Sequence, residues 1–543
     1  MFKFFTDKPK WYLNAVFYEI FLRSFKDSNG DGIGDLAGLI EKLDYLKDLG
    51  VDCLWLCPIY PSPLKDNGYD ISDFYAIDEV YGTLDDFKTL VQEVHKRGLR
   101  LIMDLVVNHT SDQHAWFQAA RSNPDSPYWD YYVWSDTDDL YRDARIIFLD
   151  TEESNWAWDE EAKKYYWHRF YSSQPDLNYA NPAVRSEMLN IIRFWLDLGI
   201  DGFRVDAVPY LFEEDGTNCE NLPETHDFLK QMREFVDRNY DDKVLICEAN
   251  QMPEDVVDYL GNGDEFHLAF QFPLMPKIFM GLRSQNRLPI EETLKKTPEI
   301  PEETQWGTFL RNHDELTLEM VTPEEREWMW KEYAPEPRMR LNLGIRRRLA
   351  PLLDNNPEKI MLAHRLLLSL PGTPFLYYGD EIGMGDNVEL PDRNGVRTPM
   401  QWDASLNAGF STSTEPWLPV IEREPFAKEN VNVEQQIQQT GSLWQQIKEL
   451  INVRKNEKVF QSNDIRFVEH ADQRVMVFTR KKDKDEMLFV HNLGGDTLQF
   501  QAALPGFNNQ KFVDLFSQVE LRTNGEMFEC TLSPHQSLYL KAG

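Results

Sequence analysis

Short apolar segments alternate with amphipathic segments through most of the chain. The apolar segments are rich in Val, Ile, Leu and Phe, and the segments between them repeat apolar residues at a helical period. This alternation is typical of parallel strands joined by crossover helices. We therefore expect strands at 16–21, 53–58, 99–107, 202–207, 244–248, 266–272, 308–312 and 374–378. The clearest helical patterns lie at 36–49, 84–97, 182–198 and 223–239.

Eight such strands fit two α/β architectures. One is a closed (β/α)8 barrel, the TIM barrel, and the other is an open doubly wound sheet. A doubly wound sheet that binds a dinucleotide has a glycine-rich turn after a strand. No such turn follows any of the expected strands. The pattern therefore favours the α/β class with a (β/α)8 barrel.

Three long stretches without this alternation interrupt the barrel. Residues 109–178 are rich in Trp, Tyr, Asp and Ser, and they predict a subdomain inserted after the third strand. Residues 314–355 are charged and predict a lid-like helical insertion, with helices around 324–332 and 338–349. Residues 380–440 are expected to be mostly loop.

The pattern changes again near residue 460. Short alternating strands after that point predict an antiparallel C-terminal β domain at 460–543. A helix at 443–459 is expected to close the barrel. The catalytic barrel would then comprise residues 1–108 and 179–459.

The charge balance excludes several classes of partner. There are 57 basic and 91 acidic residues, for a net charge of −34. Nucleic acids and anionic membranes demand a basic surface, so neither is an expected partner. No apolar run approaches the roughly 20 residues of a membrane span, and the first ten residues lack the apolar core of a signal peptide. The balance fits a protein that acts on a neutral small molecule.

The five cysteines are scattered along the chain. They are Cys53, Cys57, Cys219, Cys247 and Cys530. An odd and scattered set favours free thiols in a reducing cytoplasm.

Candidate chemistry lies at the ends of the expected strands. Arg204 and Asp206 stand two apart, so both side chains point the same way on a strand. Taken alone, this pair is more typical of a structural ion pair than of a nucleophile. Glu248 and Asp314 follow two other strands, however, and the carboxyl ends of barrel strands meet at one face. Three acids on that face indicate a catalytic site.

Four segments resemble the signature segments of the α-amylase superfamily, glycoside hydrolase family 13. They are 104–109, 202–207, Glu248 and 312–314. The resemblance covers nearly the whole chain, and the 109–178 insertion stands where that family has its B subdomain. It implies a retaining mechanism through a covalent glucosyl-enzyme.

The resemblance also implies a role for each acid. Asp206 would be the nucleophile, kept ionised by Arg204, and Glu248 would be the acid/base with a raised pKa. Asp314 would hold the sugar hydroxyls. A retaining pair is expected about 5–5.5 Å apart, and a separation of roughly 8 Å would contradict that mechanism.

Other residues are assigned to the same glucose by the resemblance. His109 and His313 would donate to its hydroxyls. Taken alone, the segment 66–70 is a turn. In exo-acting relatives the residue matching Tyr69 stacks on the sugar, while Asp66 and Arg397 would hold its non-reducing end. Such a clamp restricts the substrate to short sugars.

Two calcium sites are also implied. The loop 27–35 begins like an EF-hand, although Gly38 stands where the closing Glu is required, and a polar glycine-rich loop is the alternative. Its expected ligands are Asp27, Asn29, Asp31, the Ile33 carbonyl and Asp35. A second site, between barrel and insertion, would use Asn108 and Asp176, with Tyr210, Leu211 and Glu213 as further candidates. No organic cofactor is expected.

Two stretches point to one group within that superfamily. Residues 208–218 and 313–355 resemble trehalose synthases, which interconvert maltose and trehalose by intramolecular glucosyl transfer. The resemblance implies that glucose stays bound while a lid excludes water. The candidates for holding it are Tyr210, Asn250, Glu315 and Glu319. It is equally open that Tyr210 only packs in the core and that the two glutamates only lie on a solvated helix face.

Two alternatives remain. An α-glucosidase would hydrolyse maltose or isomaltose to glucose alone. A non-catalytic accessory subunit is disfavoured, because such a protein usually lacks one of the acids and has a membrane anchor. The expected partner is a disaccharide, and the oligomeric state is left open. No kinase-like stretch follows Gly543, so any maltose kinase partner is expected as a separate chain.

Overall fold

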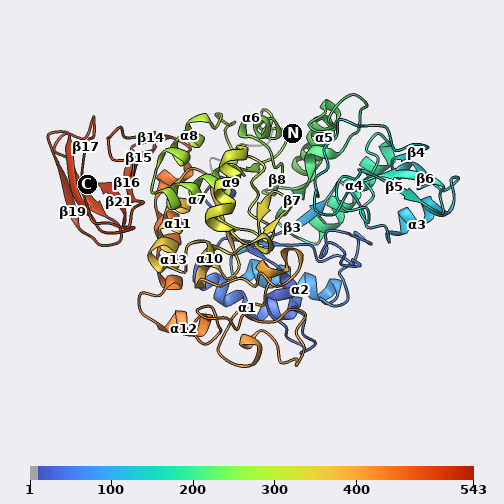
Figure 1. Cartoon of the computed structure of the whole chain (residues 1–543), viewed down its shortest axis with the longest axis horizontal. Coiled ribbons are helices and arrows are strands. Elements are labelled where there is room, and N and C mark those ends of the chain that lie inside the picture. The colour runs from blue at the N-terminus through green and yellow to red at the C-terminus, as the bar shows by residue number, and fades with distance from the viewer. Residues whose placement is uncertain (1–9) are drawn as a thin grey trace.

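The computed structural model describes residues 10–543 and contains a closed barrel of eight parallel strands (Figure 1). Their order is β1-β13-β10-β9-β8-β7-β3-β2. The strands are β1 (Phe17–Ile20), β2 (Cys53–Leu56), β3 (Arg100–Val106), β7 (Gly202–Asp206), β8 (Val244–Cys247), β9 (Leu268–Phe270), β10 (Gln305–Phe309) and β13 (Thr373–Tyr377). The predicted (β/α)8 barrel is confirmed.

One strand lies earlier than the apolar pattern predicts. The seventh was expected at 308–312, but β10 begins at Gln305, which pairs with Leu268 of β9. The apolar run continues through Leu310, beyond the last paired residue. The prediction therefore placed the end of this strand beyond its last hydrogen-bonded residue, because the apolar residues continue there. Asp314 lies in the loop that follows β10, five residues after Phe309.

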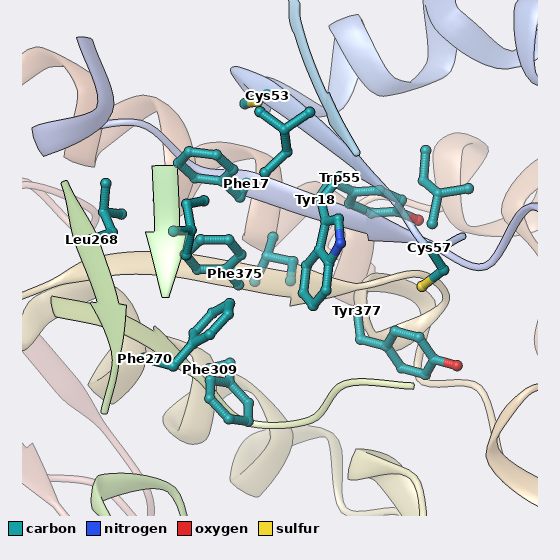
Figure 2. Close-up of a cluster of buried hydrophobic side chains, with 14 of the residues drawn as sticks. Phe17, Tyr18, Cys53, Trp55, Cys57, Leu268, Phe270, Phe309, Phe375 and Tyr377 are labelled. Atoms are coloured by element: carbon teal, nitrogen blue, oxygen red, sulfur yellow. The ribbon is translucent and has the colours of Figure 1, made fainter. Parts of the chain in front are cut away.

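Aromatic side chains fill the barrel interior. Phe17 stacks on Phe375 with ring centroids 4.5 Å apart, and Phe270 meets Phe375 edge-on at 4.8 Å (Figure 2). Trp55 and Phe309 lie against the same group. Alternate residues of each strand point inward, so the barrel is a packed core that supports the site at its carboxyl end.

Helices surround the strands. The barrel helices are α1 (Leu36–Leu49), α2 (Leu84–Lys96), α4 (Pro182–Asp197), α5 (Pro223–Asn239), α6 (Pro253–Val256), α7 (Leu274–Ser284), α8 (Leu288–Lys296), α11 (Pro357–Ser369) and α13 (Leu443–Asn456). Local signals fix several of their starts. Thr83 and Asp86 form a capping box at α2, and Asp35 caps α1 by accepting from the Gly38 N–H. Within residues 10–543, none of the helices is long and apolar enough to cross a membrane.

The segment between β3 and α4 forms its own small unit. It contains α3 (Ala115–Ser122) and a three-stranded sheet of β4 (Trp134–Ser135), β5 (Trp156–Asp159) and β6 (Lys164–Trp167). A β-bridge between His109 and Asp176 joins its two ends. In Figure 1 it lies at one end of the long axis, and the C-terminal strands lie at the other.

The predicted lid is only partly helical. Helix α9 (Pro323–Tyr333) agrees with the prediction for 324–332. The predicted helix at 338–349 is wrong, because this stretch forms a hairpin of β11 (Arg340–Leu341) and β12 (Gly344–Ile345) before the short α10 (Leu349–Leu352). Asn342 at the tip has φ +47°, a conformation outside a right-handed helix. The alternation of apolar and basic residues in 338–349 therefore reflects the extended strands of this hairpin and not a helix.

The loop 380–440 contains one short α-helix, α12 (Val433–Gln438), and 3₁₀ helices at Asp380–Ile382, Asp392–Val396 and Leu406–Gly409. After α13 an eight-stranded antiparallel sheet follows, in the order β14-β15-β16-β21-β18-β19-β20-β17. Its strands are β14 (Ile465–Phe467), β15 (Val475–Lys482), β16 (Asp485–Asn492), β17 (Leu498–Ala503), β18 (Lys511–Asp514), β19 (Glu520–Asn524), β20 (Met527–Leu532) and β21 (Ser537–Ala542). The predicted C-terminal antiparallel domain is confirmed.

Candidate active site

A pocket of about 880 Å³, open solvent at its mouth included, lies at the carboxyl ends of the barrel strands. Its walls come from strand ends, the inserted subdomain and the lid. The lining residues are Asp66, Tyr69, His109, Ile147, Phe148, Phe170, Asp206, Ala207, Tyr210, Glu248, Asn250, Phe272, Asn312, Asp314, Glu315, Thr317, Glu319 and Arg393.

The guanidinium of Arg204 organises the acids beneath this pocket. Its Nη1 lies 2.6 Å from Asp206 Oδ1 and 2.5 Å from Asp104 Oδ1, and its Nη2 lies 2.5 Å from Glu248 Oε1. The group is buried against the ring of Trp55, 5.3 Å from the centroid. A planar fork of donors holds several carboxylates in fixed directions, which a lysine cannot do. Arg204 therefore sets the positions of both predicted catalytic acids.

Asp206 and Glu248 differ in where the proton resides. Burial raises the pKa of Glu248 to about 8, and the nearby charges of Asp206 and Asp314 act in the same direction against Arg204. Burial also raises the pKa of Asp206, but Arg204 and a hydrogen bond from Glu248 oppose this. That same hydrogen bond raises the pKa of Glu248. The shared proton therefore belongs to Glu248, and Asp206 is the ionised member.

The chain turns sharply after Asp206. Ala207 has φ +51°, a left-handed conformation that is strained for a residue with a Cβ. Its backbone N–H donates to Glu248 Oε2 at 3.3 Å. The turn ends β7 and starts the short 3₁₀ helix Val208–Tyr210, so it presents Asp206 at the pocket floor. Backbone strain of this kind clusters at functional sites.

Asp314 is surrounded by cations. His313 Nε2 lies 3.1 Å from Asp314 Oδ2, and Arg393 Nη1 and Arg397 Nη2 each lie 3.0 Å from Oδ1. Burial would raise the pKa of Asp314, but His313 and the two arginines together lower it well below its usual range. Asp314 is therefore ionised and has acceptor oxygens at the pocket wall.

The predicted partner of Asp66 requires a correction. Arg393, not Arg397, pairs with it, with Nη2 2.8 Å from Asp66 Oδ1. Arg397 is fully buried behind the pocket and donates to the His313 carbonyl at 2.8 Å. The 3₁₀ helix Asp392–Val396 places the two arginines at different depths, so one lines the pocket and the other supports Asp314. Loop sequence without periodicity gave no basis for choosing between them.

The two predicted histidines also differ in position. His109 lines the pocket, and burial lowers its pKa to about 3, so the ring is neutral. His313 is fully buried and lies behind the wall, with Nε2 2.8 Å from the Tyr69 hydroxyl. The rings of Tyr69 and His313 stack at 5.2 Å. The expectation that His313 faces the sugar is therefore not met in this structure, since its nitrogens are occupied by protein groups.

All four predicted acceptor residues line the pocket, and two of them meet one arginine of the inserted subdomain. Arg145 Nη1 lies 2.8 Å from Glu319 Oε2, and Arg145 Nη2 lies 3.1 Å from the Tyr210 hydroxyl. Glu319 is thus ion-paired with the inserted subdomain instead of lying on a solvated helix face. Asn250 contacts the Thr317 hydroxyl at 3.3 Å.

The pocket also contains residues that the sequence did not single out. They are Ile147, Phe148, Phe170, Phe272, Asn312, Thr317 and Arg393. The abundance of aromatic residues in 109–178 was the available signal for Phe148 and Phe170. Residues brought in by tertiary packing, such as Phe272, leave no local signal.

The two expected calcium sites differ in how well their residues fit an ion. In the loop 27–35, Asp27 accepts from the N–H groups of Gly30 and Gly32, and Asp35 accepts from Ser28 and Gly38. Within the described residues, the acids of this loop do not form a group of three or more side chains whose ligand atoms all lie within 4.8 Å of one another. The donor chemistry suits calcium, but the acids do not converge.

The second site fits better. Asn108 Oδ1, Asp176 Oδ2 and Glu213 Oε1 are buried and lack hydrogen-bond partners within residues 10–543. Burial raises the pKa of Asp176 to about 8, and burial plus the Asp176 charge raises that of Glu213 well above its usual range. Buried orphan oxygens on neighbouring acids fit a cation that is bound by oxygen ligands. Tyr210 and Leu211 precede Glu213 in the same segment.

Known proteins agree with this geometry. The model of the α-amylase catalytic domain matches residues 19–334 and 345–463. The chain belongs to the α-amylase family. Residues 465–538 match the C-terminal domain of maltogenic amylase. The family assignment confirms the resemblance seen in the four signature segments.

Similar proteins cover nearly the whole chain. The trehalose synthase/amylase TreS of Mycolicibacterium smegmatis is 54% identical, covering 97% of this chain and 91% of that protein. The trehalose synthase of Pimelobacter sp. (strain R48) is 52% identical, covering 97% and 95%. Among solved structures, the α-glucosyl transfer enzyme XgtA superposes with a TM-score of 0.81 at 28% identity, covering 99% of this chain and 100% of that one.

Proposed function

We propose that this chain is a trehalose synthase, which interconverts maltose and trehalose by intramolecular glucosyl transfer. The observation that carries the proposal is the pair of acids Asp206 and Glu248 in a pocket whose lining residue Glu319 is ion-paired with Arg145 of the inserted subdomain. An enzyme that transfers to a sugar and not to water needs both a retaining pair and a closed site. The names of the similar proteins support the same activity.

In the first step Asp206 attacks the anomeric carbon of the non-reducing glucose of maltose. Glu248 donates its proton to the leaving glycosidic oxygen, which becomes the 4-hydroxyl of the released glucose. Asp314 and Arg393 would hold the hydroxyls of the transferred glucose, and Tyr69 would stack on its ring. The raised pKa of Glu248 suits the donor role at neutral pH.

In the second step the released glucose turns within the pocket. Glu248, now ionised, takes the proton from its anomeric hydroxyl, whose oxygen attacks the glucosyl carbon and displaces Asp206. The product is trehalose, and both acids return to their starting states. Tyr210, Asn250, Glu315 and Glu319 are the proposed contacts of the turning glucose. Water that enters instead gives glucose, the minor hydrolytic product.

Contacts between the inserted subdomain and the lid supply a physical reason for transfer to sugar. Arg145 belongs to the inserted subdomain and Glu319 to the lid, and Arg145 also reaches Glu220 at 2.8 Å. The lid residue Asn342 also donates its N–H to Asp150 Oδ2 of the subdomain at 2.7 Å. In the proposed mechanism, these contacts would hold the lid and the subdomain together while the released glucose turns, and so limit the entry of water.

An α-glucosidase is the second candidate, because hydrolysis uses the same first step. The products of maltose separate the two. Incubation of the purified protein with maltose gives mostly trehalose and a little glucose if the proposal holds, whereas glucose alone identifies the hydrolase.

Calcium and location complete the proposal. We propose a structural calcium ion at Asn108, Asp176 and Glu213, supported by their orphan oxygens within the described residues, and a second ion at the loop 27–35 on its donor chemistry alone. The ion at Asp176 would hold the inserted subdomain on the barrel. The proposed location is the cytoplasm, in keeping with five unpaired cysteines, of which four are buried.

A further inference from the structure

Glu19 is a buried acid directly behind the active site. It lies on β1, and only 1% of its surface is exposed. Its Oε1 accepts from His313 Nδ1 at 2.5 Å and from the His313 backbone N–H at 3.1 Å. One carboxyl oxygen therefore accepts from two N–H donors of the same residue, as its two lone pairs allow. Burying such a group has a high free-energy cost unless it is paired, so His313 is its required partner.

The other side of the His313 ring faces the active site. Its Nε2 lies 3.1 Å from Asp314 Oδ2 and 2.8 Å from the Tyr69 hydroxyl. Both ring nitrogens therefore face carboxylate oxygens, and a ring that donates from both nitrogens is an imidazolium. The edge of the Trp55 ring meets the same imidazole at 5.9 Å and fixes its plane.

The remaining polar groups around this pair do not replace Glu19. Cys57 Sγ lies 3.7 Å from Glu19 Oε1, but burial raises the pKa of that thiol to about 12, so it is neutral. Burial alone would lower the pKa of His313, and the groups around it, first Asp314 and then Cys57 and Glu19, raise it well above its usual value. The other titratable or charged groups facing the pair are Asp104, Tyr377, Asp380 and Arg397.

We propose that Glu19 is a positioning residue that acts through His313. It keeps the ring charged and oriented, so that Asp314 and Tyr69 are held in place for the sugar. The inference rests on one part of the proposed function, the step in which the glucosyl-enzyme forms. That step is common to an isomerase and a hydrolase, so a chromogenic aryl α-glucoside reports it even if no trehalose is formed.

The test is the pH profile of Glu19→Gln on such a glucoside. The amide keeps the shape of the Glu19 side chain and removes its charge, so the pKa of His313 should fall. As pH rises, the His313 ring should then lose its proton, and the enzyme its activity, earlier than in the wild type. We expect kcat/KM to drop about tenfold to a hundredfold at pH 8, the range of one hydrogen bond to a charged group. The alkaline limb should move to lower pH, with activity recovering on acidification. Cys57→Ala is the matched control and should keep the wild-type profile.

A uniform loss of activity with an unshifted profile would show a merely structural role and overturn the proposal. Two further measurements cover the case in which Glu19→Gln fails to fold. In a double-mutant cycle, Glu19→Asp should cost much less when His313 is already Gln, because one acts through the other. In the unmodified protein, ¹³C-histidine NMR, assigned by His313→Gln, should show a ring that stays protonated at pH 8. A neutral ring there, or additive losses in the cycle, would contradict the proposal.

Discussion

Asp206 and Glu248 are ion-paired with the same guanidinium, since Asp206 Oδ1 lies 2.6 Å from Arg204 Nη1 and Glu248 Oε1 lies 2.5 Å from Arg204 Nη2. Burial raises the pKa of both acids, and the hydrogen bond between them raises the pKa of Glu248 and lowers that of Asp206. The cation favours the ionised form of one acid while the hydrogen bond keeps the proton on the other. This division of the pair into an ionised and a protonated acid agrees with the proposed roles of nucleophile and proton donor.

The proton on Glu248 predicts the alkaline limb of the pH profile. The donor must be protonated, and its pKa is raised to about 8, so activity should be full below that pH and fall as pH rises through it. The measurement is kcat/KM for maltose between pH 5 and 10. A limb near the ordinary pKa of a glutamic acid, roughly 4.3, would refute this account of the donor.

Asp206→Asn should stop turnover without loss of the fold. The amide cannot form the glucosyl ester, and we expect kcat to fall by at least about a thousandfold. Calorimetric titration should still detect maltose binding, because Asp314, Arg393 and Tyr69 remain. Unchanged activity would remove Asp206 from the nucleophile role.

Arg393 should control the fit of the non-reducing end. Arg393→Ala removes the bridge between Asp66 and Asp314, and KM for maltose should rise about tenfold to a hundredfold. The opened wall should also admit maltotriose as a substrate. Arg393→Lys is the control that retains charge without the two-sided contact. If KM is unaffected, the clamp lies elsewhere.

The tip of the lid hairpin should limit hydrolysis. The Asn342 side chain donates to Glu315 Oε1 at 3.2 Å, and its φ of +47° suits glycine equally well. Asn342→Gly thus removes the side-chain contact without adding strain, and the share of glucose among the products should rise severalfold. Asn355→Gly, at φ +51° in the same insertion, is the matched control. Equal product ratios in the two variants would exclude this role.

Calcium removal should loosen the attachment of the inserted subdomain. Chelation should lower Tm by a few degrees, and added calcium should restore it, because an ion that binds only the folded state stabilises it. Asp176→Asn should remove the part of this response that comes from the site at Asp176, and Asp31→Asn should remove the part that comes from the loop 27–35. A Tm indifferent to calcium would exclude both sites.

The strands and most helices were predictable because their apolar residues follow local periods. The acids at strand ends were predictable for the same reason, since a strand end fixes where a side chain lies. Glu19 could not be assigned, because its partner His313 is 294 residues away in the sequence. Arg393 and Arg397 could not be told apart, and the lid hairpin was mistaken for a helix, because these segments are held by tertiary contacts and not by their own pattern.

The most direct test of the central claim is the fate of maltose in the presence of ¹³C-labelled free glucose. The account predicts trehalose as the main product, with little label in it, because the released glucose never leaves the pocket. A small amount of unlabelled glucose should accompany it from hydrolysis. Glucose as the sole product, or trehalose carrying the label at the level of the free pool, would contradict intramolecular transfer.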